Sequence, residues 1–212
     1  MTEEQRVKVW DIAVRIFHWS LVVLFFAAYL SGEDGGLFHV YAGYGVLALV
    51  AFRIVWGIIG TRHARFSDFV YGRAATLQYA RSLLSARPVH YLGHNPLGGW
   101  MVVALLVCLI GACWSGIEAY GEQGYGPLAL QDVQTVSTAA AGDNPNDYGR
   151  EGKTESGKVE GDKFWKEIHE ALSSLTLFIV ILHIIGVLVA SVLHRENLVK
   201  AMITGYKIPR AP

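Results

Sequence analysis

Four long apolar runs, separated by polar connections, dominate the chain. The runs are Ile12–Leu30, Phe38–Ile59, Leu97–Ile117 and Leu172–Leu193. Each is close to the ~20 residues that a helix needs to cross a bilayer. Within lipid, only helices and closed barrels satisfy every backbone polar group. The pattern therefore predicts an all-α fold, a four-transmembrane-helix bundle, in a single membrane domain over residues 1–212. The predicted helices cover about 12–30, 38–59, 97–117 and 168–193.

The connections between these runs differ in charge. Five arginines and a single acid, Asp68, lie in the second connection, residues 60–96, and the tail after Leu193 is also basic. The third connection, residues 118–166, carries nine acidic and five basic residues. Because basic loops stay in the cytoplasm, we expect a multi-pass membrane protein with both termini cytoplasmic and with loop 118–166 on the outer side.

Within the second connection, residues 68–86 carry apolar positions beside Arg73 and Arg81. An interfacial helix there, with the arginines near lipid phosphates, is one interpretation. A plain loop is the other.

Composition agrees with a membrane protein. The chain is 52% hydrophobic and 17% charged, whereas soluble domains are about 25% charged. The net charge of zero gives no case for nucleic-acid binding. Cys108 and Cys113 lie inside an apolar run, and without a CxxCH motif we expect no covalently attached haem. The polar residues 1–11 show no signal peptide, so the first run is read as a retained span.

Four of the eight histidines fall at two predicted membrane depths. His169 and His183 are 14 residues apart, which puts them within about 40° around a helix axis and ~21 Å apart along it. His18 lies 13 residues before the outer connection, ~20 Å in depth, and so matches His183. His39 opens the second span at the outer side and matches His169. The sequence thus predicts an inner pair and an outer pair.

Paired histidines on different helices suit axial ligation of haem iron. The alternative is that each histidine only hydrogen-bonds a neighbouring helix. Zinc fits less well, because neither level offers the further Cys or carboxylate ligands of a tetrahedral site. Arg15 and Arg53 are candidates to reach haem propionates or lipid phosphates at the cytoplasmic side. His63, His90 and His94 sit in a basic, wet connection, where we expect no ligand role.

Several motifs resemble the bacterial cytochrome b561 family, which includes the b-type membrane subunits of nickel–iron hydrogenases. They are WDIAVRIFHW from Trp10, HVYAGY from His39, RIVWG from Arg53, GHNPLGGW from Gly93 and HRENLVKAMITG from His194. The resemblance covers nearly all of the chain except the third loop. It implies two b-type haems in a four-helix bundle, with ligands at His18, His39, His169 and His183, the set that the depths select.

The resemblance also implies a location in a bacterial inner membrane, which makes loop 118–166 periplasmic. The implied function is electron transfer between the membrane quinone pool and a periplasmic redox partner. The acidic balance of loop 118–166 would suit a partner with a basic patch, such as a c-type cytochrome. A hydrogenase or another oxidoreductase is a further candidate, and homo-oligomerisation is left open. The alternatives are a stand-alone superoxide:quinone oxidoreductase, and a haem-free membrane scaffold or transporter.

A quinone site is expected beside the cytoplasmic-side haem. Its candidate lining residues are His94 and Asn95, with Arg15 or Arg53 nearby. Asn95 followed by Pro96 is also a helix-start signal, with Asn as the N-cap and Pro at the first helical position. Both interpretations of Asn95 stay open from the sequence.

Overall fold

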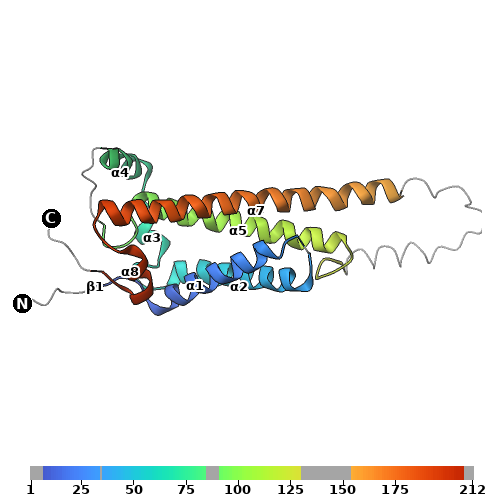
Figure 1. Ribbon diagram of the computed structural model, residues 1–212, viewed down its shortest axis with the longest axis horizontal. Helices are drawn as coiled ribbons and strands as arrows, with labels where there is room; N and C mark the ends of the chain where they lie inside the picture. The colour runs from blue at the N-terminus through green and yellow to red at the C-terminus, as the bar shows by residue number, and fades with distance from the viewer. Residues whose placement is uncertain (1–6, 34, 85–90, 130–153, 208–212) are drawn as a thin grey trace, which may run out of the picture. The chain divides into compact units, whose positions relative to one another are not determined.

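The computed structural model describes residues 7–33, 35–84, 91–129 and 154–207 (Figure 1). Within them, four helices are long and apolar enough to cross a membrane. They are α1 (Ile12–Leu30), α2 (Leu37–Ile59), α5 (Pro96–Glu122) and the Lys163–Leu193 part of α7 (Thr154–Leu193). The four predicted spans are confirmed as helices, while His90 and part of the third loop lie outside the described residues.

Two helices are longer than hydropathy predicts. Helix α5 continues five residues past Ile117, and α7 begins at Thr154, well before the expected span. Charged residues end an apolar run without ending a helix, because Glu and Lys are good helix formers. The ends of the predicted loop 118–166 are therefore helical.

The predicted 68–86 helix is divided in two. Helix α3 (Phe66–Phe69) is followed, after residues 70–72, by helix α4 (Arg73–Leu84). Gly72, in the break, favours flexible backbone over helix. The predicted helix is confirmed over Arg73–Leu84, although it begins later than expected. The plain-loop alternative was wrong for the described part, and the interfacial position of the helix stays a prediction.

The chain divides into two compact units, of which the first contains residues 1–107 and 177–212. In this unit α1 packs against α2. Strand β1 (Val7–Lys8) pairs antiparallel with β2 (Tyr206–Lys207), with Val7 opposite Lys207. The helix before β2, α8 (Leu198–Thr204), ends at Gly205 in the left-handed region, φ +86°. A Cβ at Gly205 would lie 2.7 Å from the Trp10 carbonyl oxygen, so glycine is required for the two ends of the chain to pair.

A small core lies beside this strand pair. It consists of Val9, Trp10, Val14, Ala64 and Ala201. By contrast, the apolar helices expose large side chains along their length, such as Val23, Ile58, Val107 and Val192. This is the pattern of helices whose outer faces contact lipid rather than water.

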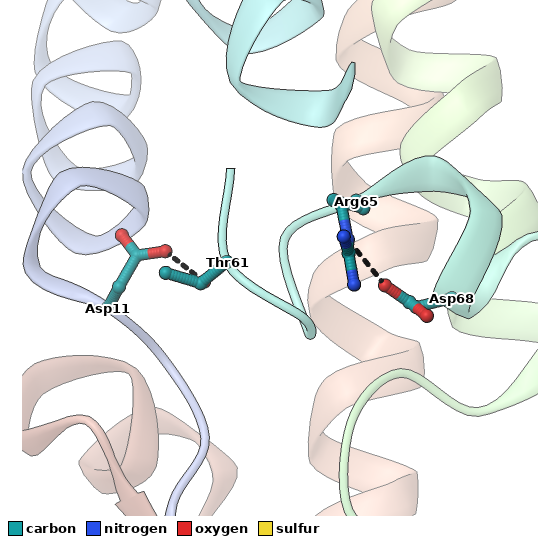
Figure 2. Close-up of polar contacts among 4 residues, drawn as sticks. All are labelled: Asp11, Thr61, Arg65 and Asp68. Carbon is teal, nitrogen blue, oxygen red and sulfur yellow. Dashed lines mark hydrogen bonds and ion pairs between the residues drawn. The ribbon is translucent and has the colours of Figure 1, made fainter. Parts of the chain in front are cut away.

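Asp11 fixes the start of α1 and ties it to the end of α2. Its carboxylate accepts a hydrogen bond from the Val14 amide at 2.8 Å, the N-cap arrangement. The same carboxylate accepts from the Trp56 indole at 3.1 Å and from the Thr61 hydroxyl (Figure 2). Burial opposes ionisation, but these hydrogen bonds outweigh it and lower the pKa of Asp11 below its usual 3.8.

Candidate functional site

His39 lies in the first turn of α2 and contacts α1. Its Nδ1 lies 2.8 Å from the carbonyl oxygen of Ala28. A carbonyl can only accept, so Nδ1 carries the proton and donates, and the lone pair of the neutral ring is on Nε2. This is the arrangement of metal-binding histidines, in which one ring nitrogen donates to a carbonyl and the other faces the metal.

His169 shows the same arrangement in the second unit, residues 108–176. Its Nδ1 lies 2.9 Å from the carbonyl oxygen of Ala112 and 3.4 Å from the hydroxyl of the buried Ser115. The ring lies close to Gly116, where a Cβ would be 3.0 Å from His169 Cε1. Glycine at this position leaves room for the imidazole, and the Ala112 carbonyl sets the same tautomer as in His39.

His18 and His183 both lie in the first unit. His18 on α1 and His183 on α7 are close enough for an electrostatic interaction. The Nδ1 of His18 is buried and has no hydrogen-bond partner among the described residues. A buried ring nitrogen without a partner is costly in an apolar site, and binding at one ring nitrogen would offset that cost. The residues present therefore fit a group held between these two helices.

The outer pair is divided between the two units. His39 belongs to the first and His169 to the second. Each has the ring tautomer that iron ligation through Nε2 requires, and their pairing stays a prediction from membrane depth.

Arg53 is a buried cation on α2, only 4% exposed. Its guanidinium carbon lies 4.9 Å from the ring centre of Phe66 and 5.6 Å from that of Phe69. Cation–π contacts of this kind partly offset the cost of burial. Its Nη1 has no hydrogen-bond partner in the described part of the chain, so this donor is available to an acceptor on a ligand.

His94 packs between two aromatic rings, 4.6 Å from the centre of Trp10 and 4.6 Å from that of Phe69. Burial, followed by the charges of Arg53 and Lys207, lowers the pKa of His94 from 6.5 to about 3. The ring is therefore neutral at physiological pH, and its buried Nδ1 has no partner among the described residues. The prediction that His94 lies in a wet connection was wrong. The rings that bury it belong to Trp10 and Phe69, which are distant from His94 in the sequence, so the sequence pattern did not reveal this packing.

The other two candidates have structural partners. Arg15 donates a hydrogen bond to the carbonyl of Ile203 in α8. Asn95 Oδ1 accepts from the Gly98 amide at 2.7 Å, one turn into α5. The N-cap interpretation of Asn95 is confirmed, and only its amide nitrogen remains for a ligand. The Nε2 of His194 lies 3.2 Å from the hydroxyl of the buried Tyr79.

Among the described residues, no three His, Cys, Asp or Glu side chains form a group that could hold a metal ion. Axial ligation of haem asks for two imidazoles from the protein, since the porphyrin supplies the other four iron ligands. The assignment of His18, His39, His169 and His183 as such ligands stays a prediction.

These features define a multi-pass helical membrane protein with histidines at two levels of its spans. The family described as prokaryotic cytochrome b561 matches residues 9–205, and the chain belongs to this family. Membership implies that it is a membrane cytochrome with b-type haem. The family match confirms the resemblance that the sequence motifs indicated.

A curated relative is the probable Ni/Fe-hydrogenase B-type cytochrome subunit of Cupriavidus necator. It is 30% identical over an alignment of 142 residues, and the match covers 54% of this chain and 58% of the relative. The chain thus spans less than two thirds of that protein's length. No solved structure matches the chain.

Proposed function

We propose that this protein is a dihaem cytochrome that carries electrons between the quinone pool of a bacterial inner membrane and a periplasmic redox partner. His18 with His183 would hold one haem towards the cytoplasm, and His39 with His169 would hold the other towards the periplasm. The main support is the shared tautomer of the outer histidines, whose Nδ1 atoms lie 2.8 and 2.9 Å from carbonyls of neighbouring helices.

Bound haem would supply one-electron transfer. His18, His39, His169 and His183 would hold the haem irons through ring nitrogens, which would keep other ligands off the iron. The Ala28 and Ala112 carbonyls orient the outer ligands and make their Nε2 atoms more basic. Helix α7 would carry one ligand of each haem, ~21 Å apart along its axis, so that one rigid element spaces the two electron carriers.

The quinone would bind near the inner pair, beside Arg53 and His94. Neutral His94 can donate to a quinone carbonyl oxygen or accept from a quinol hydroxyl through Nδ1, which has no partner in the described residues. Arg53 Nη1 offers a charged donor within the same aromatic cluster, suited to negative charge on a reduced quinone oxygen. The amide of Asn95 and the side chain of Arg15 are further candidates at this end of the protein.

A hydrogenase is one candidate partner, because the name of the Cupriavidus relative refers to one. A c-type cytochrome is another, given the acidic balance of residues 118–166. In either case the partner would exchange electrons with the haem on the His39–His169 side.

Reduction by a water-soluble quinol in purified, haem-loaded protein tests the two sides separately. We expect His183→Ala to abolish reduction by quinol, and His39→Ala to preserve reduction of the remaining haem. His63→Ala, which changes a histidine outside the spans, should leave both haems reducible. If quinol reduction is lost in His39→Ala and kept in His183→Ala, the quinone site lies beside the His39–His169 pair, and its assignment to the His18–His183 pair is wrong.

A further inference from the structure

A groove lies between the end of α7 and α8, at the membrane-boundary end of the span. Its volume is about 600 Å³, within the range of small-molecule sites. The apolar lining comes from Leu188 and Val192 of α7, and from Val199 and Ile203 of α8. Leu188 and Val192 belong to the candidate span, so one wall of the groove continues the lipid-facing surface of α7.

Two cations lie at the groove, Arg195 and Lys200. Both are exposed, and neither makes an ion pair within the described part of the chain. The acid that also lines the groove, Glu196, pairs with Lys207 at 3.6 Å, and both of these side chains are largely buried. The charge of Glu196 is therefore compensated, and the groove has a net positive charge from Arg195 and Lys200.

Arg195 is held in an unusual backbone conformation. It is the only non-glycine residue with positive φ in the described chain, at 49°. The Glu196 amide donates to the Ser191 carbonyl at 3.0 Å and the Arg195 amide donates to the Val192 carbonyl at 3.1 Å, which is the Schellman ending of a helix. Glycine is the usual residue at this position, so arginine occupies it at a conformational cost.

We propose that this groove binds one anionic phospholipid of the adjacent leaflet. The phosphate group would contact Arg195 and Lys200, and one acyl chain would lie along Leu188 and Val192. The apolar wall continuous with the span favours a lipid, and the uncompensated positive charge favours an anionic headgroup over a zwitterionic one.

Native mass spectrometry of the full, haem-loaded chain tests this directly. Phosphatidylglycerol or phosphatidylcholine with identical acyl chains would be titrated into protein in neutral detergent. We expect one phosphatidylglycerol to bind at least tenfold more tightly than phosphatidylcholine. Arg195→Gly and Lys200→Gln should each weaken its binding about fivefold, and the double variant should bind both lipids alike. Arg62→Gly, which removes an exposed cation that does not line the groove, should match the wild type.

Arg195→Gly also separates binding from folding. Because glycine suits the left-handed cap, the lipid-free variant should melt at or above the wild-type temperature, and Lys200→Gln carries the test if it does not. Equal binding of the two lipids by the wild type would overturn the proposal, as would wild-type selectivity in the double variant. Complete displacement of the lipid by millimolar inorganic phosphate would also overturn it, because the groove would then be a phosphate site.

Discussion

Gly116 sets how closely α5 can approach the imidazole of His169. A Cβ there would lie 3.0 Å from Cε1 and 3.1 Å from Nδ1, closer than ordinary van der Waals contact. We expect Gly116→Ala to push the ring away from the Ala112 carbonyl and to change the absorption and midpoint potential of one haem. Gly111→Ala is the matched control on the same helix, since its Cβ would meet only the flexible end of Leu172 at 3.3 Å. Identical spectra for both variants would show that Gly116 does not position the ligand.

His94 should make stability depend on pH. Its pKa in the folded protein, about 3, lies below the 6.5 of an unperturbed histidine. Between these values the unfolded chain binds more protons, so the free energy of unfolding rises with pH and reaches its full value above 6.5. We expect the melting temperature to fall as the pH drops from 7 to 5, and to fall less in His94→Gln. The slope has an upper limit of about 1.4 kcal/mol per pH unit for one group. Equal slopes for the two proteins would contradict the burial of a neutral His94.

Asp11 should contribute more to stability than the other carboxylate in Figure 2. Asp11→Ala removes an N-cap and the hydrogen bonds from Trp56 and Thr61, and a cap alone contributes about 1 kcal/mol. Asp68→Ala breaks only a partly exposed ion pair with Arg65, which contributes less than about 1 kcal/mol. Thermal unfolding should therefore show the larger decrease for Asp11→Ala, and a larger decrease for Asp68→Ala would contradict this interpretation.

At the scale of elements, α7 carries both levels of histidines on one continuous helix. Inserting one alanine between Leu175 and Thr176 would rotate His183 by about 100° relative to His169 without reducing hydrophobicity. We expect this variant to insert into the membrane and to lose at least one haem. The same insertion between Lys163 and Phe164 lies before both histidines, keeps their spacing, and should retain the wild-type haem content. Full haem content in the first variant would show that the 14-residue spacing has no role.

The sequence predicted the spans well because the bilayer imposes a length on every apolar run. It failed where helices continue into polar residues, as α5 does through Glu122 and α7 does from Thr154. Hydropathy indicates which residues lie within the lipid. The end of a helix is set instead by capping and helix-breaking residues, which can lie beyond the apolar run. Asn95 is the instructive case, because its cap signal was visible in the sequence and the structure contains the hydrogen bond.

The candidate site was less accessible to sequence reasoning. Helix periodicity put four histidines at two depths, but it could not show which atoms hold them, because the Ala28 and Ala112 carbonyls are backbone groups of other helices. Nor could it show the burial of His94 between Trp10 and Phe69. A short sheet formed by residues from both ends of the chain was also missed, since two-residue strands have no periodicity to detect.

At the scale of the whole molecule, the strand pair β1–β2 bears on the membrane topology. Because β1 and β2 share hydrogen bonds, the two ends of the chain lie on the same side of the bilayer. The four spans of the described residues, an even number, also put both ends on one side. The positive-inside rule then favours the cytoplasm for that side. In the proposed function, α7 would carry one histidine of each pair, and electrons would cross the membrane through this one chain.

Haem content in paired histidine variants tests the central claim most directly. Pyridine haemochrome assays should give two haem b per chain for the wild type and for His63→Ala. We expect one haem per chain when His18 and His183 are both replaced by alanine, and one when His39 and His169 are. Replacing His18 and His39 together should remove both haems. A wild type with one haem or none, or complete haem loss on replacing only His18 and His183, would contradict two bis-histidine sites at two depths.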